Sequence, residues 1–67
     1  MKIFGERLKE LREEKNLSTK VLGKSIGVSN AAICYWENNT YDIKGEYLVR
    51  LAQFFGVSTD YLLGLEE

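Results

Sequence analysis

The stretch Thr19–Asn38, TKVLGKSIGVSNAAICYWEN, decides the organisation of the chain, and it predicts two short helices joined by a tight turn. Leu22 and Ile26 lie four residues apart, and Ile33 and Trp36 lie three apart. Each pair therefore shares one face of a helix, and that face is expected to be buried.

Three small residues mark the turn between these helices. Gly23 has no Cβ, so a second helix can cross the first closely, as two helices meeting at a steep angle require. Gly27 is expected to end the first helix, because glycine adopts the left-handed conformation at little cost. Ser29 is the predicted N-cap of the second helix, where its hydroxyl accepts a free backbone amide.

The outward face of the second helix carries Asn30, Ala31, Cys34 and Tyr35, none of which is charged. A helix face that is merely solvated usually holds Glu, Lys or Arg. A small, neutral, hydrogen-bonding face instead suits contact with another polar surface.

Length and composition indicate one domain, residues 1–67, with no linker, repeat or second domain. A single cysteine forms no internal disulfide, and the absence of histidine argues against a metal site or other cofactor. No long apolar run indicates a signal peptide or a membrane span. We therefore expect a cytoplasmic, bacterial or phage-encoded protein without a membrane partner.

The net charge of −1 is unevenly distributed along the chain. Residues 1–44 carry eight cations against six anions, whereas residues 45–67 carry one cation against four anions. A distant acidic face is largely screened at physiological salt, where the Debye length is about 8 Å. The acidity is thus compatible with nucleic-acid binding, although it predicts weak non-specific binding.

Further helices are predicted on both sides of the central stretch. A helix over residues 3–15 has an apolar stripe at Phe4, Leu8 and Leu11, and another over residues 45–55 buries its own stripe. Ser18 and Ser58 are the predicted N-caps of the second and fifth helices. The fold class is therefore all-α, with five helices and a helix-turn-helix over about residues 18–38.

The chain resembles the lambda-repressor-like, Cro-like (XRE) helix-turn-helix transcription regulators. The resemblance rests on the pattern of the central stretch and on Leu51-Ala52, Phe55-Gly56-Val57-Ser58 and Asp60–Gly64, and it covers roughly residues 4–64. It implies a compact five-helix domain whose helix 29–38 lies in the major groove of double-stranded DNA.

The resemblance also implies two groups of DNA-contacting residues. The predicted base contacts are Asn30, Ala31, Tyr35 and Cys34. The predicted phosphate contacts are Ser18, Thr19, Lys20, Ser29, Asn38, Asn39, Thr40 and Lys44. Thr19 stands where the family usually has Gln, and a simple surface role for Lys20 remains an equal alternative.

Two structural roles complete the predictions. By resemblance, Arg12 pairs with Glu37 and locks the first helix against the third; the alternative is two solvent-exposed charges. An exposed apolar patch of Phe54, Tyr61, Leu62 and Leu65 predicts a homodimer interface. The alternative is that the fifth helix simply caps the core.

The function implied is a sequence-specific transcriptional regulator, a repressor that binds a near-palindromic operator as a homodimer. The alternative is a protein-interaction module, antirepressor-like, that uses this fold without DNA. An enzyme is not expected, because no nucleophile–base pair, phosphate loop or metal-ligand set is present. No small-molecule ligand is evident.

Overall fold

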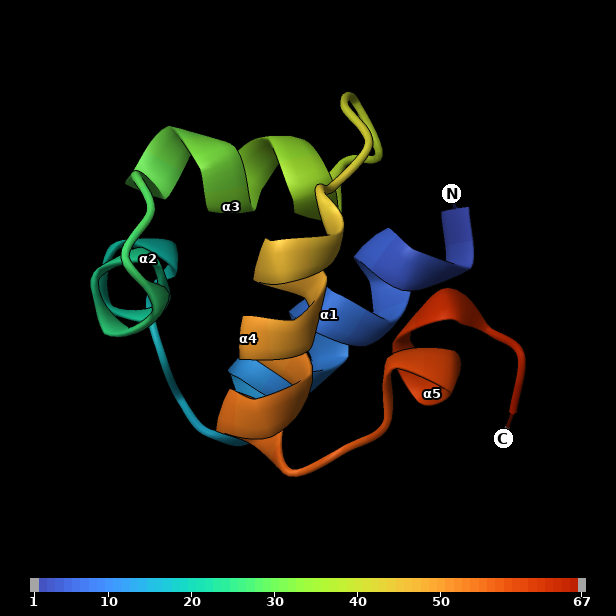
Figure 1. Ribbon diagram of the computed structural model, residues 1–67. Coiled ribbons are helices and arrows are strands. Elements are labelled where there is room, and N and C mark those ends of the chain that lie inside the picture. Colours follow the sequence, from blue (N-terminus) through green and yellow to red (C-terminus); the bar gives the residue numbers. More distant parts are fainter. Residues whose placement is uncertain (1, 67) are drawn as a thin grey trace.

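The computed structural model describes residues 2–66, except for the side chain of Lys2, and these residues contain helices and no strands. The helices are α1 (Lys2–Glu14), α2 (Thr19–Ile26), α3 (Asn30–Glu37), α4 (Gly45–Phe55) and α5 (Thr59–Leu63). In Figure 1, α3 runs along one edge of the molecule and α2 lies at its N-terminal end. Within the described residues no helix is long and apolar enough to cross a membrane.

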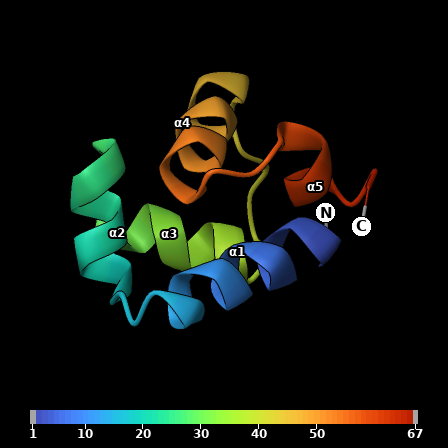
Figure 2. The same ribbon diagram turned by 90° about the horizontal axis from the view of Figure 1, so that it is seen from below.

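One hydrophobic core lies between the helices, and every helix contributes to it. Its buried members are Phe4, Leu8, Leu22, Ile26, Ile33, Trp36, Leu51, Ala52, Phe55 and Leu62. Figure 2 shows α1 beside α3, with α4 and α5 on the other side of this core. The all-α fold and its apolar stripes are as the sequence predicts.

Local signals determine where the short helices begin and end. The Ser18 hydroxyl accepts a hydrogen bond from the Val21 amide at 3.0 Å, and the Ser29 hydroxyl accepts one from the Ala32 amide at 3.1 Å. Gly27 ends α2 with a φ of 82°, in the left-handed region. The helix-turn-helix is therefore confirmed in its predicted register.

Gly23 is required for a closer contact than the sequence suggests. A Cβ at this position would lie 2.8 Å from the Val28 carbonyl oxygen and 3.1 Å from that of Ser29. The neighbour that needs the space is thus the backbone of the turn itself, which folds back over α2 before α3 begins.

The C-terminal segment is held against α1 by Arg7. Its guanidinium lies 4.3 Å from the centroid of the Tyr61 ring, donates to the Tyr61 carbonyl, and donates to the Glu66 carbonyl at 2.5 Å. Cation–π contact and charge-assisted hydrogen bonds both favour this arrangement. The start of α1 and the segment after α5 consequently lie on the same side of the molecule (Figure 1).

This packing corrects one prediction at the proposed dimer surface. Leu62 is fully buried in the core, so its predicted place in an exposed patch is wrong. The ring of Tyr61 is half-buried beneath Arg7, whereas Phe54 and Leu65 remain exposed. The fifth helix thus caps the core through Leu62, which is the alternative that the sequence left open.

Candidate nucleic-acid interface

The outer face of α3 is open to solvent. Asn30, Ala31 and Tyr35 are exposed, and Cys34 is half-buried beside them. The opposite face packs inward through the buried Ile33 and Trp36. The 3.6-residue period of the helix therefore produces one apolar face and one uncharged polar face, as the sequence predicts.

Asn30 is oriented by a neighbour from α2. Its Oδ1 accepts a hydrogen bond from the Thr19 hydroxyl, and the Cys34 thiol lies 3.9 Å from the same oxygen. An amide oxygen has two lone pairs, so these two donors face both of them, whereas the NH₂ group keeps two donors. The side chain of Asn30 is thus positioned from within the protein. It has donors for a base edge, and its oxygen can accept from a base in exchange for the weak thiol contact.

The same hydrogen bond changes the expectation for Thr19. Its hydroxyl proton is used on Asn30, and a phosphate oxygen needs a donor. A phosphate contact at this position therefore has to come from the backbone amide, which lies at the free N-terminal end of α2.

The other predicted phosphate contacts on the two helix starts keep free donors. Ser18 and Ser29 accept backbone amides as N-caps, so each hydroxyl proton remains available. Lys20 is exposed on α2, and Lys44 is exposed at the N-cap position of α4 without a side-chain capping bond. These four residues therefore present hydrogen-bond donors and positive charge from the starts of α2, α3 and α4.

The turn after α3 is partly directed inward. Asn38 and Thr40 are exposed, but Asn39 is half-buried and its Oδ1 accepts the Gly5 amide at 3.2 Å. Asn39 also has a φ of 56°, in the left-handed region, which asparagine tolerates better than most residues. Its side-chain oxygen therefore serves the contact with α1.

Arg12 and Glu37 form the predicted ion pair. Arg12 Nε donates to Glu37 Oε2 at 2.6 Å and Nη2 donates to Oε1 at 3.1 Å, with the side chains only 14% and 7% exposed. Arg12 Nη1 also donates to the Leu17 carbonyl at 2.7 Å. The hydrogen bond to Glu37 is the main cause of a raised pKa for Arg12, and burial opposes it.

The family follows from comparison with known sequences. A helix-turn-helix family model matches residues 8–62, which include all of α2, α3 and α4. This chain belongs to the XRE-type helix-turn-helix family.

Three curated relatives of this XRE-type domain are bacterial or phage regulators. Repressor protein C2 of Salmonella phage P22 is 39% identical over 61 residues, which is 91% of this chain and 28% of that protein. The transcriptional regulator ImmR of Bacillus subtilis is 33% identical over 64 residues, which is 96% of this chain and 50% of ImmR. The transcriptional activator BcrR of Enterococcus faecalis is 39% identical over 64 residues, which is 96% of this chain and 31% of BcrR. The XRE-type domain thus spans half or less of the length of these relatives.

Solved structures agree with the fold of the XRE-type domain. The P22 c2 repressor, solved in complex with a synthetic operator, has a TM-score of 0.86 and 37% identity, covering 92% of this chain and 94% of that one. The restriction-modification controller protein C.AhdI of Aeromonas hydrophila has a TM-score of 0.83 and 26% identity, covering 91% and 92%.

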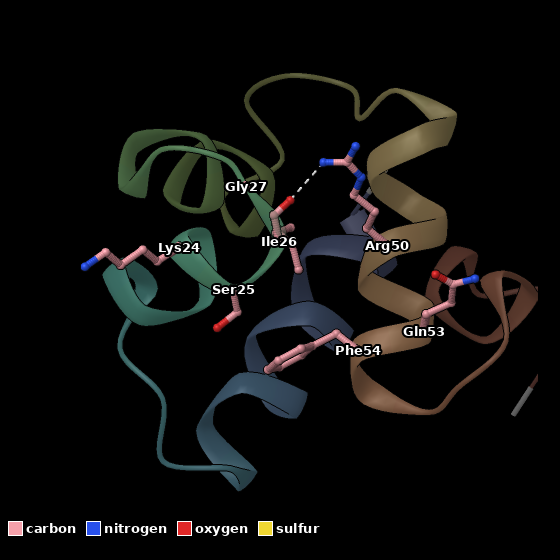
Figure 3. Close-up of a pocket in the computed structure, with 7 residues that line it drawn as sticks. All are labelled: Lys24, Ser25, Ile26, Gly27, Arg50, Gln53 and Phe54. Carbon is pink, nitrogen blue, oxygen red and sulfur yellow. Dashed lines mark hydrogen bonds between the residues drawn. The ribbon is translucent and has the colours of Figure 1, made fainter.

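A groove between α2 and α4 of the XRE-type domain is bridged by a structural hydrogen bond from Arg50. Arg50 Nη1 donates to the Ile26 carbonyl at 3.1 Å, and its guanidinium lies 5.3 Å from the centroid of the Tyr47 ring. Figure 3 shows this bond across the groove and Lys24 pointing away from it. A cation at a helix C-terminus satisfies a free carbonyl and the helix dipole, so Arg50 fastens α2 to α4.

Two residues next to the candidate interface of this XRE-type domain are not among those predicted from the sequence. Tyr41, after the turn, is 63% exposed and its ring contacts Tyr35. Gly5 lies inside α1, where a Cβ would be 2.5 Å from the Glu37 carbonyl oxygen. A glycine inside a helix costs about 1 kcal/mol relative to Ala, and this cost was the available signal for a close approach.

Proposed function

We propose that this XRE-type domain binds double-stranded DNA sequence-specifically and that the protein carrying it represses transcription. The observation that carries the proposal is the uncovered, uncharged outer face of α3. An α-helix with its side chains is about 10–12 Å across, which fits a major groove about 12 Å wide. The similar P22 c2 repressor was solved in complex with operator DNA, which supports the same use here.

Each class of contact follows from the chemistry of the exposed side chains. The amide of Asn30 suits the N6 and N7 edge of adenine, and Ala31 suits a thymine methyl group. Tyr35 offers an apolar ring and a hydroxyl, and the half-buried Cys34 lies beside them. The proposed phosphate contacts through side chains are Ser18, Lys20, Ser29, Asn38, Thr40 and Lys44. Thr19 is proposed to contact a phosphate through its backbone amide, and Asn39 is held as part of the turn.

The repressor is proposed to act as a homodimer on a near-palindromic operator. Two copies of α3 would then enter successive major grooves about 34 Å apart. Phe54 and Leu65 are exposed apolar residues and are the members of the predicted patch that can contribute to such an interface. Repression would follow from occupying a promoter.

A selection of bound sites from a random DNA pool tests this function. We expect an enriched pair of inverted half-sites separated by about one helical turn, and a mobility shift on the selected DNA. Log K should fall with log salt by about 0.9 per phosphate contact, with a shallow total slope because few cations lie on this face. No enrichment, together with no shift at micromolar protein and low salt, would remove the proposal.

One observation favours a second function, an antirepressor-like protein-interaction module. The only charged residue of α3 is Glu37, and Arg12 already pairs with it. The helix therefore brings no cation to a duplex. Flat DNA titrations together with a stable, stoichiometric complex with one bacterial regulator would favour this second function over DNA binding.

A further inference from the structure

Tyr35 and Tyr41 form an aromatic pair at the end of the α3 face. Their ring centroids are 5.0 Å apart and their planes are at 87°, an edge-to-face contact. Tyr35 is 45% exposed and Tyr41 is 63% exposed. Edge-to-face rings attract each other because the positive edge of one meets the negative face of the other. The contact lies at the surface, so burial of apolar area explains little of it.

The pair is set by a well-defined turn. The Asn39 amide donates to the Trp36 carbonyl at 3.2 Å, and the Thr40 amide donates to the Tyr35 carbonyl at 2.9 Å. With Asn39 in the left-handed conformation, these bonds make a Schellman motif, which turns the chain back beside the last turn of α3. Figure 1 shows the loop rising at that end of the helix. Tyr41 is the next residue, and the turn places its ring against Tyr35.

The turn is itself held by α1. The Gly5 amide donates to Asn39 Oδ1, and the space beside Gly5 is filled by the Glu37 carbonyl and the Asn39 side chain. The position of Tyr41 therefore depends on contacts with the core of the domain. The Tyr41 ring thus meets the Tyr35 ring from a turn whose backbone is fixed by hydrogen bonds.

From this geometry we propose that Tyr41 is a positioning residue for base recognition by Tyr35. Tyr41 holds the Tyr35 ring in one orientation before DNA arrives, so that binding does not have to order a mobile side chain. The proposal rests on the proposed function, in which Tyr35 faces the major groove. The added claim is that the base preference at the position read by Tyr35 depends on Tyr41, a residue of the following loop, as well as on Tyr35.

The first test uses the free protein and needs no DNA. The variants are Tyr41→Ala, which removes the ring, and Tyr41→Phe, which keeps it. We expect Tyr41→Ala to shift the Tyr35 ring resonances in NMR spectra and to increase the motion of that side chain. Tyr41→Phe should leave the motion of Tyr35 unchanged. Equal Tyr35 dynamics in the parent and in Tyr41→Ala would overturn the proposal.

The second test measures base preference on DNA selected by the parent protein. We expect Tyr41→Ala and Tyr35→Ala to relax the preference at the same base position, and Tyr41→Ala to weaken binding by about three- to tenfold. In the double variant the two losses should not add, because both remove one unit. Tyr41→Phe should bind like the parent.

Two other outcomes would overturn the proposal. A uniform loss of affinity in Tyr41→Ala, with the base preference intact, would make Tyr41 a phosphate contact. A Tyr41→Phe variant as weak as Tyr41→Ala would assign the effect to the hydroxyl. If the parent protein binds no DNA at all while the free protein behaves as expected, the proposed function fails and the coupling of the two rings stands as a structural finding only.

Discussion

Arg12 holds both carboxylate oxygens of Glu37 across 25 positions of sequence, with one bond of 2.6 Å and one of 3.1 Å. Because α1 supplies the arginine and α3 ends at the glutamate, the pair fixes the helix that carries the proposed DNA-binding face. The remaining Arg12 nitrogen, Nη1, donates to the Leu17 carbonyl in the link before α2. One guanidinium therefore connects three segments of the domain.

We expect Glu37→Ala to lower the free energy of unfolding by about 2–4 kcal/mol, because it leaves a largely buried guanidinium without its carboxylate. That is a large part of the roughly 3–5 kcal/mol that a core of this size supplies. Urea denaturation should show a lower midpoint with an unchanged slope. The Arg12→Met, Glu37→Leu double variant is the control and should regain much of the loss. A Glu37→Ala midpoint equal to that of the parent would contradict the structural role.

The effect of pH on the contribution of Arg12 to stability has a defined direction. The pKa of Arg12 is raised above the ordinary value, chiefly by the hydrogen bond from Arg12 to Glu37. A cation with a raised pKa in the folded state contributes stability that is complete below its unfolded pKa and is lost only as pH rises through the folded one. Both values lie far above neutrality, so Arg12 should make no contribution to the slope of stability against pH near neutral pH.

Asn30→Ala and Tyr35→Ala test the proposed base contacts. Each should weaken specific binding by about 1–3 kcal/mol and leave the unfolding midpoint nearly unchanged, since both side chains are exposed. Titrations on the selected operator and on scrambled DNA measure the two affinities separately. Lys20→Ala is the comparison, because loss of a phosphate contact should weaken both affinities equally. If Asn30→Ala and Tyr35→Ala both bind like the parent, these residues do not read bases.

Thr19→Val tests whether α2 orients the reading face of α3. The substitution keeps the shape of the side chain and removes the hydroxyl that donates to Asn30 Oδ1. We expect specific binding to weaken by about 0.5–1.5 kcal/mol, with the relaxed preference confined to the base that Asn30 reads. Thr19→Ser keeps the hydroxyl and is the matched control. Loss of affinity in both variants to the same extent would argue against the hydrogen bond.

The fold was predictable because its signals are local. Ser18 and Ser29 begin helices and Gly27 ends one through contacts within a few residues, so short sequence windows are enough to locate them. Hydrophobic periodicity then assigns the inward faces of α1 and α4. The helix α5 has only five residues, and such a short segment does not reveal which apolar residue turns inward. The prediction that Leu62 is exposed was wrong for that reason.

The exposure of the outer face of α3 was predictable from the sequence, whereas the orientation of its side chains was not. The period of α3 exposes Asn30 and Tyr35, but their orientations depend on partners from other elements, Thr19 and Tyr41. The residue pattern of one helix contains no information about hydrogen bonds to other helices. It also does not show where a following turn places the next side chain. Gly5 is a similar case, because its neighbour on α3, the Glu37 carbonyl, lies more than thirty positions away in sequence.

Gly5→Ala provides a stability test of that remote contact. Helix propensity alone favours Ala over Gly by about 1 kcal/mol. The new Cβ, however, would lie 2.5 Å from the Glu37 carbonyl oxygen and 2.7 Å from both polar atoms of the Asn39 side chain. Since the carbonyl is backbone at the end of α3, the clash has to be relieved by moving a helix, and we expect a net loss of about 1–3 kcal/mol.

The matched control for this test is Gly45→Ala, at the first position of α4. No heavy atom lies within 4 Å of a Cβ there, so the substitution should stabilise the protein by about 0.4–1 kcal/mol through the unfolded state. Opposite signs for the two glycines in urea denaturation would confirm that the space beside Gly5 is what matters. A Gly5→Ala protein as stable as Gly45→Ala would mean that α1 and the end of α3 are not in close contact in solution, and the fixed turn before Tyr41 would lose its support.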